Sequence, residues 1–288
     1  MRNYHSNEIP HITSVAIRVL NLKKSINFYT NTLGMKLINQ NDKQVDFGAN
    51  SKDVLLTLIQ LENGHPKASR TAGLYHVAYL LPTRKDLGLI LKHFIELKTP
   101  LQGASNHGIS EAIYLADPDG NGIEIAADTP DTAWKWNGDT LDILSENGPI
   151  DVQAVLNEAN GFEFTGLPDS TIVGHLHLNA SELIESKRFY RDILGLDIVI
   201  EIPNSAIFMA YGMYHHHIAI NLWNGKGVKQ AKSNTPGLMV AKLSIPTEIQ
   251  LHNIENKLNE LNYPYIKKDH SLIVNDPSGN QFSLQSNS

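Results

Sequence analysis

Two histidines and one glutamate stand at positions that could hold a metal ion. His76 and His175 each lie in a segment with alternating apolar residues, and Glu124 lies in GIEIAAD, after the turn sequence DPDGN. On a strand, Glu124 points away from its neighbours Ile123 and Ile125, so it can face a cleft while they enter the core. Two imidazoles and a carboxylate bind a divalent transition metal on one face and leave other positions open. We therefore predict these three residues as metal ligands.

The run YHHHIAINLW contains three consecutive histidines that could line the same cavity. If the whole run is a strand, His217 and Asn221 share a face, and His216 points to the other side. We therefore predict that His217 faces the metal cavity, in reach of a bound molecule. His177, two residues beyond His175, is predicted to line the cavity as well, and Asn221 with it.

Two more residues could contact a bound molecule. Tyr114 lies ten residues before Glu124, in the segment before the DPDGN turn, and His107 lies in the loop before that segment. Both are candidates for the cavity wall. An ordinary strand tyrosine and a surface loop histidine are the alternatives, and the sequence alone leaves both open.

Composition restricts the class of protein. The chain has 288 residues, a net charge of −6 and 41% apolar residues, and it contains no cysteine. Disulfides and thiolate metal sites are thereby excluded. The acidic balance argues against a nucleic-acid partner, and no apolar run is long enough to span a membrane. We expect a soluble cytoplasmic protein, with a homo-oligomer possible.

The order of segments repeats four times. SVAIRVLNLKKSINFYTNTLGMKL matches HLHLNASELIESKRFYRDILGLDI, GLYHVAYLLPT matches GLMVAKLSIPT, and DPDGN matches DPSGN. Each copy reads as strand, helix and three strands. The predicted fold is therefore α+β, with four βαβββ modules. The modules span about 11–62, 73–127, 172–225 and 236–286.

The same repeats suggest a division into two domains. We expect a first domain at 1–127, holding modules 1 and 2, and a second at 172–288, holding modules 3 and 4. Residues 128–171 would be a linker packed on the surface, with a short helix near 152–160. Superposing the modules gives two columns of equivalent positions. The first column holds Ser14, His76, His175 and Val240, and the second holds Thr57, Glu124, Asn221 and Ser283.

These motifs resemble the vicinal oxygen chelate superfamily, which includes glyoxalase I, extradiol dioxygenases and antibiotic-resistance proteins. TAGLYHVAYLLPTRKDLG, SEAIYLADPDGNGIEIAAD, VGHLHLN and YHHHIAINLW look most like the bacillar-type catechol 2,3-dioxygenases. Extradiol enzymes of this kind act in aromatic hydrocarbon catabolism and bind Fe(II) through two histidines and one glutamate. The resemblance implies His76, His175 and Glu124 as ligands, and it implies His217 and Tyr114 as catalytic residues beside the metal.

The resemblance also implies that the four modules form two paired-module units with cupped, barrel-like sheets, and it implies how they pair in space. Some four-module glyoxalases pair module 1 with 4 and module 2 with 3. That pairing would bring the three predicted ligands together, and it would leave a second site without metal, lined by Ser14, Thr57, Val240 and Ser283.

Three functions remain open at this point. The first is a non-haem Fe(II) extradiol dioxygenase that takes catechol or a substituted catechol with O2, using His217 as acid/base and His107, His177 and Asn221 as substrate contacts. The second is a glyoxalase-like isomerase or lyase using Zn, Mn or Ni. Sites of that kind usually carry a second glutamate where Asn221 stands. The third is a non-catalytic protein that binds a small aromatic molecule.

Overall fold

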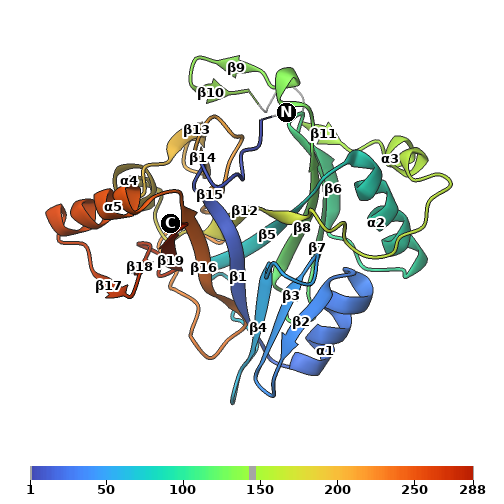
Figure 1. Cartoon of the computed structure of the whole chain (residues 1–288), viewed down its shortest axis with the longest axis horizontal. Helices are drawn as coiled ribbons and strands as arrows, with labels where there is room; N and C mark the ends of the chain where they lie inside the picture. Colours follow the sequence, from blue (N-terminus) through green and yellow to red (C-terminus); the bar gives the residue numbers. More distant parts are fainter. Residues whose placement is uncertain (1, 143–146, 288) are drawn as a thin grey trace.

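The computed structural model describes residues 2–142 and 147–287. Within these ranges the strands form two large sheets and one small hairpin, with helices packed on the outside (Figure 1). We name the sheets after the predicted modules that supply their strands. The 1/4 sheet has the strand order β17-β18-β19-β16-β1-β4-β3-β2, and the 2/3 sheet has the order β11-β6-β7-β8-β5-β12-β15-β14-β13.

The strands of the 1/4 sheet are β1 (His11–Val19), β2 (Lys36–Gln40), β3 (Gln44–Gly48), β4 (Leu56–Gln60), β16 (Gly237–Ile245), β17 (Tyr265–Lys268), β18 (Ser271–Asn275) and β19 (Gln281–Ser286). Those of the 2/3 sheet are β5 (Gly73–Leu81), β6 (Gly103–Asn106), β7 (Ser110–Ala116), β8 (Gly122–Asp128), β11 (Gly148–Pro149), β12 (Ile172–Asn179), β13 (Asp197–Ile202), β14 (Ala206–Ala210) and β15 (Ile218–Asn221). The hairpin is β9 (Trp136–Asn137) with β10 (Thr140–Leu141). The helices are α1 (Leu22–Asn27), α2 (Arg84–Glu96), α3 (Val152–Glu158), α4 (Leu183–Arg188) and α5 (Glu248–Glu260), with π-helical turns at Phe28–Thr32 and Phe189–Ile193.

Each sheet is joined at its centre by the first strands of two modules. β1 pairs antiparallel with β16, and β5 pairs antiparallel with β12. The two sheets also touch each other, through β1 with β12 and β16 with β5. The predicted α+β fold of repeated βαβββ modules in two paired units is confirmed. The division into domains at 1–127 and 172–288 stays a prediction.

The repeated Pro-Thr dipeptide begins the long helix in two modules. Thr83 precedes α2 and accepts a hydrogen bond from the Asp86 amide, and Thr247 precedes α5 and accepts one from Gln250. A threonine at this position satisfies an amide that the helix itself leaves unpaired. Each helix then buries a leucine- and isoleucine-rich face, with α2 packing on β5, β7 and β8, and α5 on β16 and β19.

The DP-x-GN sequences form the same turn in both copies. Asp117 accepts hydrogen bonds from the Asn121 amide and side chain, and Asp276 accepts the corresponding pair from Asn280. The second carboxylate oxygen of each aspartate accepts a hydrogen bond from a buried tyrosine of the preceding module. Those tyrosine–aspartate pairs are Tyr29 with Asp117 and Tyr190 with Asp276. The turn is thus structural in both halves of the chain, and it ties consecutive modules together.

The segment between the second and third modules is folded onto the molecule. β11 adds a strand to the edge of the 2/3 sheet by pairing with β6, and α3 packs on α2. Gly88 in α2 makes this close packing possible, since a Cβ there would collide with the Val155 carbonyl. Trp134 is buried. No helix within the described ranges is both long and apolar enough to cross a membrane.

Candidate metal centre and its cavity

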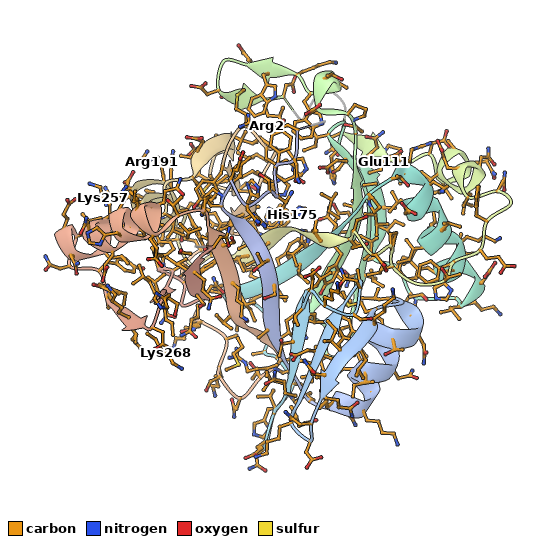
Figure 2. All side chains as sticks on the ribbon, viewed as in Figure 1. Arg2, Glu111, His175, Arg191, Lys257 and Lys268 are labelled. Carbon is orange, nitrogen blue, oxygen red and sulfur yellow. The ribbon has the colours of Figure 1, made fainter. Side chains whose placement is uncertain are left out.

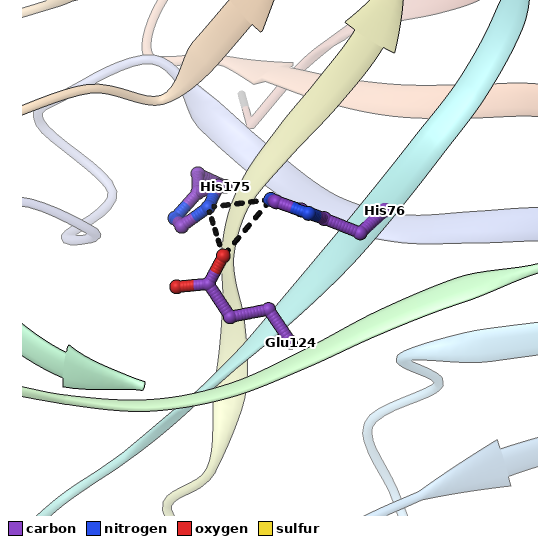
Figure 3. Close-up of side chains that lie close together, drawn as sticks. All are labelled: His76, Glu124 and His175. Atoms are coloured by element: carbon purple, nitrogen blue, oxygen red, sulfur yellow. Dashed lines mark hydrogen bonds and ion pairs between the residues drawn. The ribbon is translucent and has the colours of Figure 1, made fainter. Parts of the chain in front are cut away.

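The structure brings the three predicted ligands together on the 2/3 sheet (Figure 3). His76 Nε2 lies 2.9 Å from Glu124 Oε2, His175 Nε2 lies 3.2 Å from the same oxygen, and the two imidazole nitrogens are 3.3 Å apart. All three side chains are buried. Figure 2 shows His175 in the interior, whereas the labelled Arg191 and Lys257 lie at the periphery.

Strand register explains why the three side chains meet. Ala78 of β5 pairs with His175 of β12 on one side and with Glu124 of β8 on the other. His76 lies two residues before Ala78 and therefore on the same face of β5. The small Ala78 side chain leaves room above the sheet, so the three longer side chains converge there.

The donor set fits a divalent cation. Atoms bound about 2.1 Å from one ion at right angles to each other lie about 3.0 Å apart, and the observed separations are close to this value. Two imidazoles and a single carboxylate oxygen are ligands that first-row transition metals accept. The metal grouping found among the described residues consists of these three.

Electrostatics favour a cation at this point as well. Burial alone would raise the pKa of Glu124, but the adjacent His175 and His76 imidazoles hold that pKa well below its usual range. Burial lowers the pKa of His76 despite the nearby carboxylate. The glutamate is therefore ionised and His76 is neutral, and these are the protonation states in which a carboxylate and an imidazole bind a metal ion.

A cavity of about 460 Å³ opens beside the three residues. One wall carries polar side chains from β5, β7 and β12, among them Tyr114 and His177, and the other carries apolar side chains from β13 and β14. The apolar residues of that wall are Ile200, Ile202 and Phe208. Tyr75 and Trp223, 41% and 51% exposed, lie at its mouth with their rings 5.0 Å apart.

His107 and Tyr114 form a pair in this wall. Tyr114 lies directly opposite Glu124 across β7 and β8, and its hydroxyl lies 2.8 Å from His107 Nε2. His107 Nδ1 in turn lies 2.9 Å from the side-chain oxygen of Asn147. Burial and the nearby negative charge of Glu124 raise the pKa of Tyr114, so its phenol keeps its proton. Both residues line the cavity, as the sequence predicts, and their functional roles stay predictions.

Comparisons with known proteins identify the superfamily of the chain. Over 272 residues the chain is 37% identical to the catechol-2,3-dioxygenase of Bacillus subtilis strain 168, covering 94% of the chain and 95% of that protein. Residues 9–125 match the family model of the Glyoxalase/Bleomycin resistance protein/Dioxygenase superfamily. The chain belongs to this superfamily. A biphenyl-2,3-diol 1,2-dioxygenase of Rhodococcus globerulus is also 37% identical, over 75 residues that make up 24% of the chain and 37% of that protein.

Solved structures share the superfamily fold. Glyoxalase I from Zea mays is 16% identical and superposes with a TM-score of 0.60, covering 96% of this chain and 92% of its own. The cppA protein from Streptococcus pneumoniae is 13% identical with a TM-score of 0.59, covering 96% and 98%. At these identities the similarity concerns the fold alone.

Within this superfamily member, His216 and His217 are placed opposite to the prediction. His216 lines the cavity, with its ring centroid 4.0 Å from that of His175, whereas His217 is not among the described residues of the lining. The prediction extended strand alternation through the histidine run. β15 begins only at Ile218, and the loop before it turns with positive φ angles at Gly212 and Met213. Alternation therefore does not hold at these two histidines.

His217 is held by the backbone instead. Its Nε2–H donates to the Tyr4 carbonyl at 3.0 Å, and its Nδ1 accepts from the Tyr211 amide at 3.2 Å. Burial and the nearby His5 lower the pKa of His217 well below its usual value. Both ring nitrogens are thus hydrogen-bonded to the backbone and the ring is neutral. His217 therefore does not face the cavity, and the prediction that it does so as an acid/base is wrong.

Asn221 also differs from the prediction. Glu124 pairs with Ala78, which lies two residues after His76, the first-column residue of module 2. In module 3 the first-column residue is His175, and the residue two positions after it is His177, which pairs with Ala219. Ala219, rather than Asn221, therefore occupies the ligand column of module 3. The sequence superposition of module 3 was therefore wrong by two residues. It treated His215, His216 and His217 as part of the strand, whereas β15 begins only at Ile218.

Asn221 supports His177 from behind the cavity wall. Its side-chain oxygen accepts the Trp223 amide at 2.9 Å, so its Nδ2–H faces His177 Nε2, also at 2.9 Å. His177 Nε2 must then be an acceptor, and its proton lies on Nδ1. His177 lines the cavity as predicted, whereas Asn221 is not among the described lining residues and acts through His177.

The equivalent positions of the 1/4 sheet carry different side chains. Thr57 pairs with Ala16 and donates to Asp46 at 2.7 Å, and Ser283 pairs with Lys242. Sequence reasoning placed Thr57 and Ser283 at these positions, and its expectation of a second site without metal stays a prediction. It missed the aromatic residues at the cavity mouth, Tyr75 and Trp223, for which the sequence signal was only an aromatic residue beside a predicted site residue.

Proposed function

We propose that this protein is a non-haem Fe(II) extradiol dioxygenase that cleaves the ring of a substituted catechol. The observation that supports this best is the buried group of His76, Glu124 and His175 at one end of a half-apolar cavity. The 37% identity to a catechol-2,3-dioxygenase over nearly the whole chain supports the same reaction class.

His76, Glu124 and His175 would hold the metal. When bound, Fe(II) supplies open coordination positions for two vicinal oxygens and O2, and it passes electron density between them. Extradiol cleavage breaks one ring carbon–carbon bond next to the diol and places both atoms of O2 in the product. The ring provides all the electrons, so no separate reductant is consumed. The donor set also accepts Zn, Mn or Ni, so the purified protein can carry one of these ions.

His216 is positioned to take the proton that the substrate hydroxyl loses. Burial and the surrounding histidines lower its pKa well below the usual value, so the ring is neutral near pH 7 and has a lone pair available. Its Nδ1 faces His215, at 2.9 Å from that residue's Nδ1. Its Nε2 is therefore the nitrogen left for the cavity. A positioned histidine typically contributes about 10²–10⁴-fold to such a step.

Tyr114 and His107 are proposed to orient a substrate oxygen. Tyr114 keeps its phenolic proton and donates it to His107 Nε2, because His107 Nδ1 faces the Asn147 oxygen. Tyr114 also lies opposite Glu124, so its oxygen can accept a hydrogen bond from a substrate hydroxyl beside the metal position. His107 holds the hydroxyl at 2.8 Å and limits its rotation. His177, whose tautomer is set by Asn221, presents its face from the neighbouring strand.

The size of the cavity favours a substituted ring. Its volume of about 460 Å³ lies in the range that fits drug-sized ligands, and one unsubstituted ring would leave much of it unfilled. Ile200, Ile202 and Phe208 form an apolar wall away from the ligand residues. We therefore propose that the substituent is apolar and lies against β13 and β14.

A metal-dependent isomerase or lyase is the alternative with the same fold. Such a centre usually uses a fourth protein ligand at the position that Ala219 occupies by strand register, and alanine has no donor atom. The chain offers three protein ligands at this point among its described residues, which favours the dioxygenase.

A substrate panel tests the proposal. Protein loaded anaerobically with Fe(II) is mixed with catechol and with catechols carrying methyl, ethyl and phenyl groups, and ring opening is followed in air-saturated buffer. Turnover is expected, with kcat/KM rising as the apolar substituent grows. If the Zn(II)-loaded protein converts methylglyoxal–thiol adducts while the Fe(II)-loaded protein leaves every catechol intact, the isomerase is the correct function.

A further inference from the structure

Behind the cavity wall, three side chains outside the metal group are joined in a row. His216 lines the cavity, and its Nδ1 lies 2.9 Å from Nδ1 of His215. His215 Nε2 lies 3.0 Å from Oδ1 of Asp128. His215 is 1% exposed, whereas the side chain of Asp128 is 16% exposed and borders a separate small cavity below the N-terminal residues 2–5.

Hydrogen-bond roles along this row follow from its outer end. An ionised carboxylate only accepts, so the Asp128 oxygen facing His215 requires a proton on His215 Nε2. A neutral imidazole carries one ring proton, so His215 Nδ1 is then a lone pair. The short contact between the two Nδ1 atoms needs one donor, and His216 must provide it. The proton of His216 is consequently on Nδ1, and Nε2 is unprotonated.

Packing holds the same rings in place. The His216 ring lies between the rings of His175 and Phe208, at centroid distances of 4.0 and 5.1 Å. Tyr214 covers the His215 ring at 3.9 Å and donates its hydroxyl to the second oxygen of Asp128 at 2.9 Å. The carboxylate is thus fixed by two donors, and its Oδ1 is kept directed at His215.

We infer that Asp128 and His215 are positioning residues that set the tautomer of His216 and so direct an unprotonated Nε2 into the cavity. This inference rests on the proposed function for its catalytic consequence, whereas the tautomer itself is a property of the protein alone. Where a carboxylate fixes a catalytic histidine directly, its loss costs up to about 10⁴-fold in kcat. Because His215 stands between the two groups here, the expected loss is roughly 10–10²-fold.

The first test is Asp128→Asn in the full-length protein. An amide can present either an oxygen or an N–H to His215, so the tautomer of His216 is no longer determined. In protein loaded with Zn(II), which has no unpaired electrons, ring-nitrogen NMR of labelled histidines should show His216 as Nδ1–H in the wild type and as a mixture in Asp128→Asn. Asp131→Asn is the matched control, since this nearby carboxylate hydrogen-bonds Arg2, Tyr4 and Thr132 and, among the described residues, contacts no histidine of the row.

Kinetics of the Fe(II)-loaded protein form the second readout. Asp128→Asn should lower kcat with KM and iron content unchanged, and Asp131→Asn should match the wild type. A wild-type spectrum with Nε2–H on His216 overturns the inference, whatever the activity. A fall in kcat that only follows lost iron also overturns it, since Asp128 would then support the fold. A correct tautomer in a protein that cleaves no catechol instead supports the positioning and refutes the proposed function.

A second pair of variants keeps the test sharp if Asp128→Asn fails to fold. His215→Gln can donate to Asp128 and accept from His216, whereas His215→Phe fills similar space without hydrogen bonds. Positioning predicts that the Phe variant loses kcat by roughly 10–10²-fold and that the Gln variant loses clearly less. Equal losses in the two variants would mean that His215 acts by packing, and the inference would fail.

Discussion

His216 and His217 are consecutive in the chain, yet only His216 lines the cavity, while both ring nitrogens of His217 bond to the backbone of Tyr4 and Tyr211. This separates two residues of the same chemistry into two roles. His216 has a nitrogen available to a bound molecule, and His217 fastens the N-terminal segment to the loop before β15.

Replacing each of these histidines with glutamine should therefore give different defects. His216→Gln should retain its metal and lower kcat by about 10²–10⁴-fold, the usual contribution of a positioned acid/base. His217→Gln should keep kcat within about tenfold but lose roughly 1–3 kcal/mol of unfolding free energy, because buried backbone groups lose well-placed partners. Steady-state kinetics and urea unfolding measure the two effects. Similar kinetic losses in both variants would contradict the assignment.

The metal group can be tested against its equivalent in the other sheet. Glu124→Ala removes the oxygen shared by both histidines and should reduce bound metal to a small fraction of the wild-type content, measured by elemental analysis after dialysis. Ser283→Ala, at the corresponding position of the 1/4 sheet, should leave metal content unchanged. If Glu124→Ala still binds one equivalent as tightly as the wild type, the proposed ligand set is wrong.

Tyr114 should affect turnover more than binding of the metal. Tyr114→Phe removes one hydroxyl, which lies 2.8 Å from His107, and leaves the ring in the cavity wall. A hydrogen bond between neutral partners is worth about 0.5–1.5 kcal/mol, so kcat should fall by roughly 2–12-fold at constant metal content. His107→Gln should show a smaller loss in the same assay, since it only orients the hydroxyl. A Tyr114→Phe variant with wild-type kcat would exclude the proposed hydrogen bond to substrate.

Stability should depend on pH through His5. Its Nε2–H donates to the Gly174 carbonyl at 2.8 Å, but burial dominates and lowers the pKa of His5 to about 4. The unfolded chain, with an ordinary pKa near 6.5, binds the proton more readily. The unfolding free energy linked to neutral His5 is therefore fully present above about pH 6.5 and is lost as pH falls toward 4. This loss of stability amounts to roughly 2–3 kcal/mol.

His5→Gln keeps a donor for the Gly174 carbonyl but cannot be protonated. Its unfolding free energy should equal that of the wild type within about 1 kcal/mol at pH 7 and should fall less between pH 6.5 and 4.5. Urea unfolding at several pH values measures this. The exposed His270→Gln variant should follow the wild-type curve, and so would His5→Gln if His5 were not the titrating group.

The repeats explain why so much of the fold was predictable. Alternating apolar residues, Pro-Thr before a helix and DP-x-GN before a strand are local signals, and each recurs where a physical requirement recurs. The grouping of His76, Glu124 and His175 was predictable because these ligand-type residues stand at matching strand positions of repeated modules. Pairing of β5 with β12 then brings them together without any further local signal.

The errors fall where local alternation ends. The side of the sheet to which His216 points depends on a loop with positive φ at Gly212 and Met213. The residue of module 3 that is equivalent to Glu124 depends on where β15 begins. Asp128 and His215 were missed because their contact joins residues far apart in the sequence. Strand periodicity carries no information about such a contact, which is decided by tertiary packing alone.

Isotope incorporation during ring cleavage tests the central claim most directly. Full-length protein is loaded with Fe(II) under anaerobic conditions, mixed with an alkyl-substituted catechol and exposed to ¹⁸O2, and the product is analysed by mass spectrometry at early times. The account predicts one O2 consumed per catechol and both labelled atoms in an open-chain product, with Glu124→Ala inactive under the same conditions. A catechol recovered intact, or a product that carries no label, would contradict it.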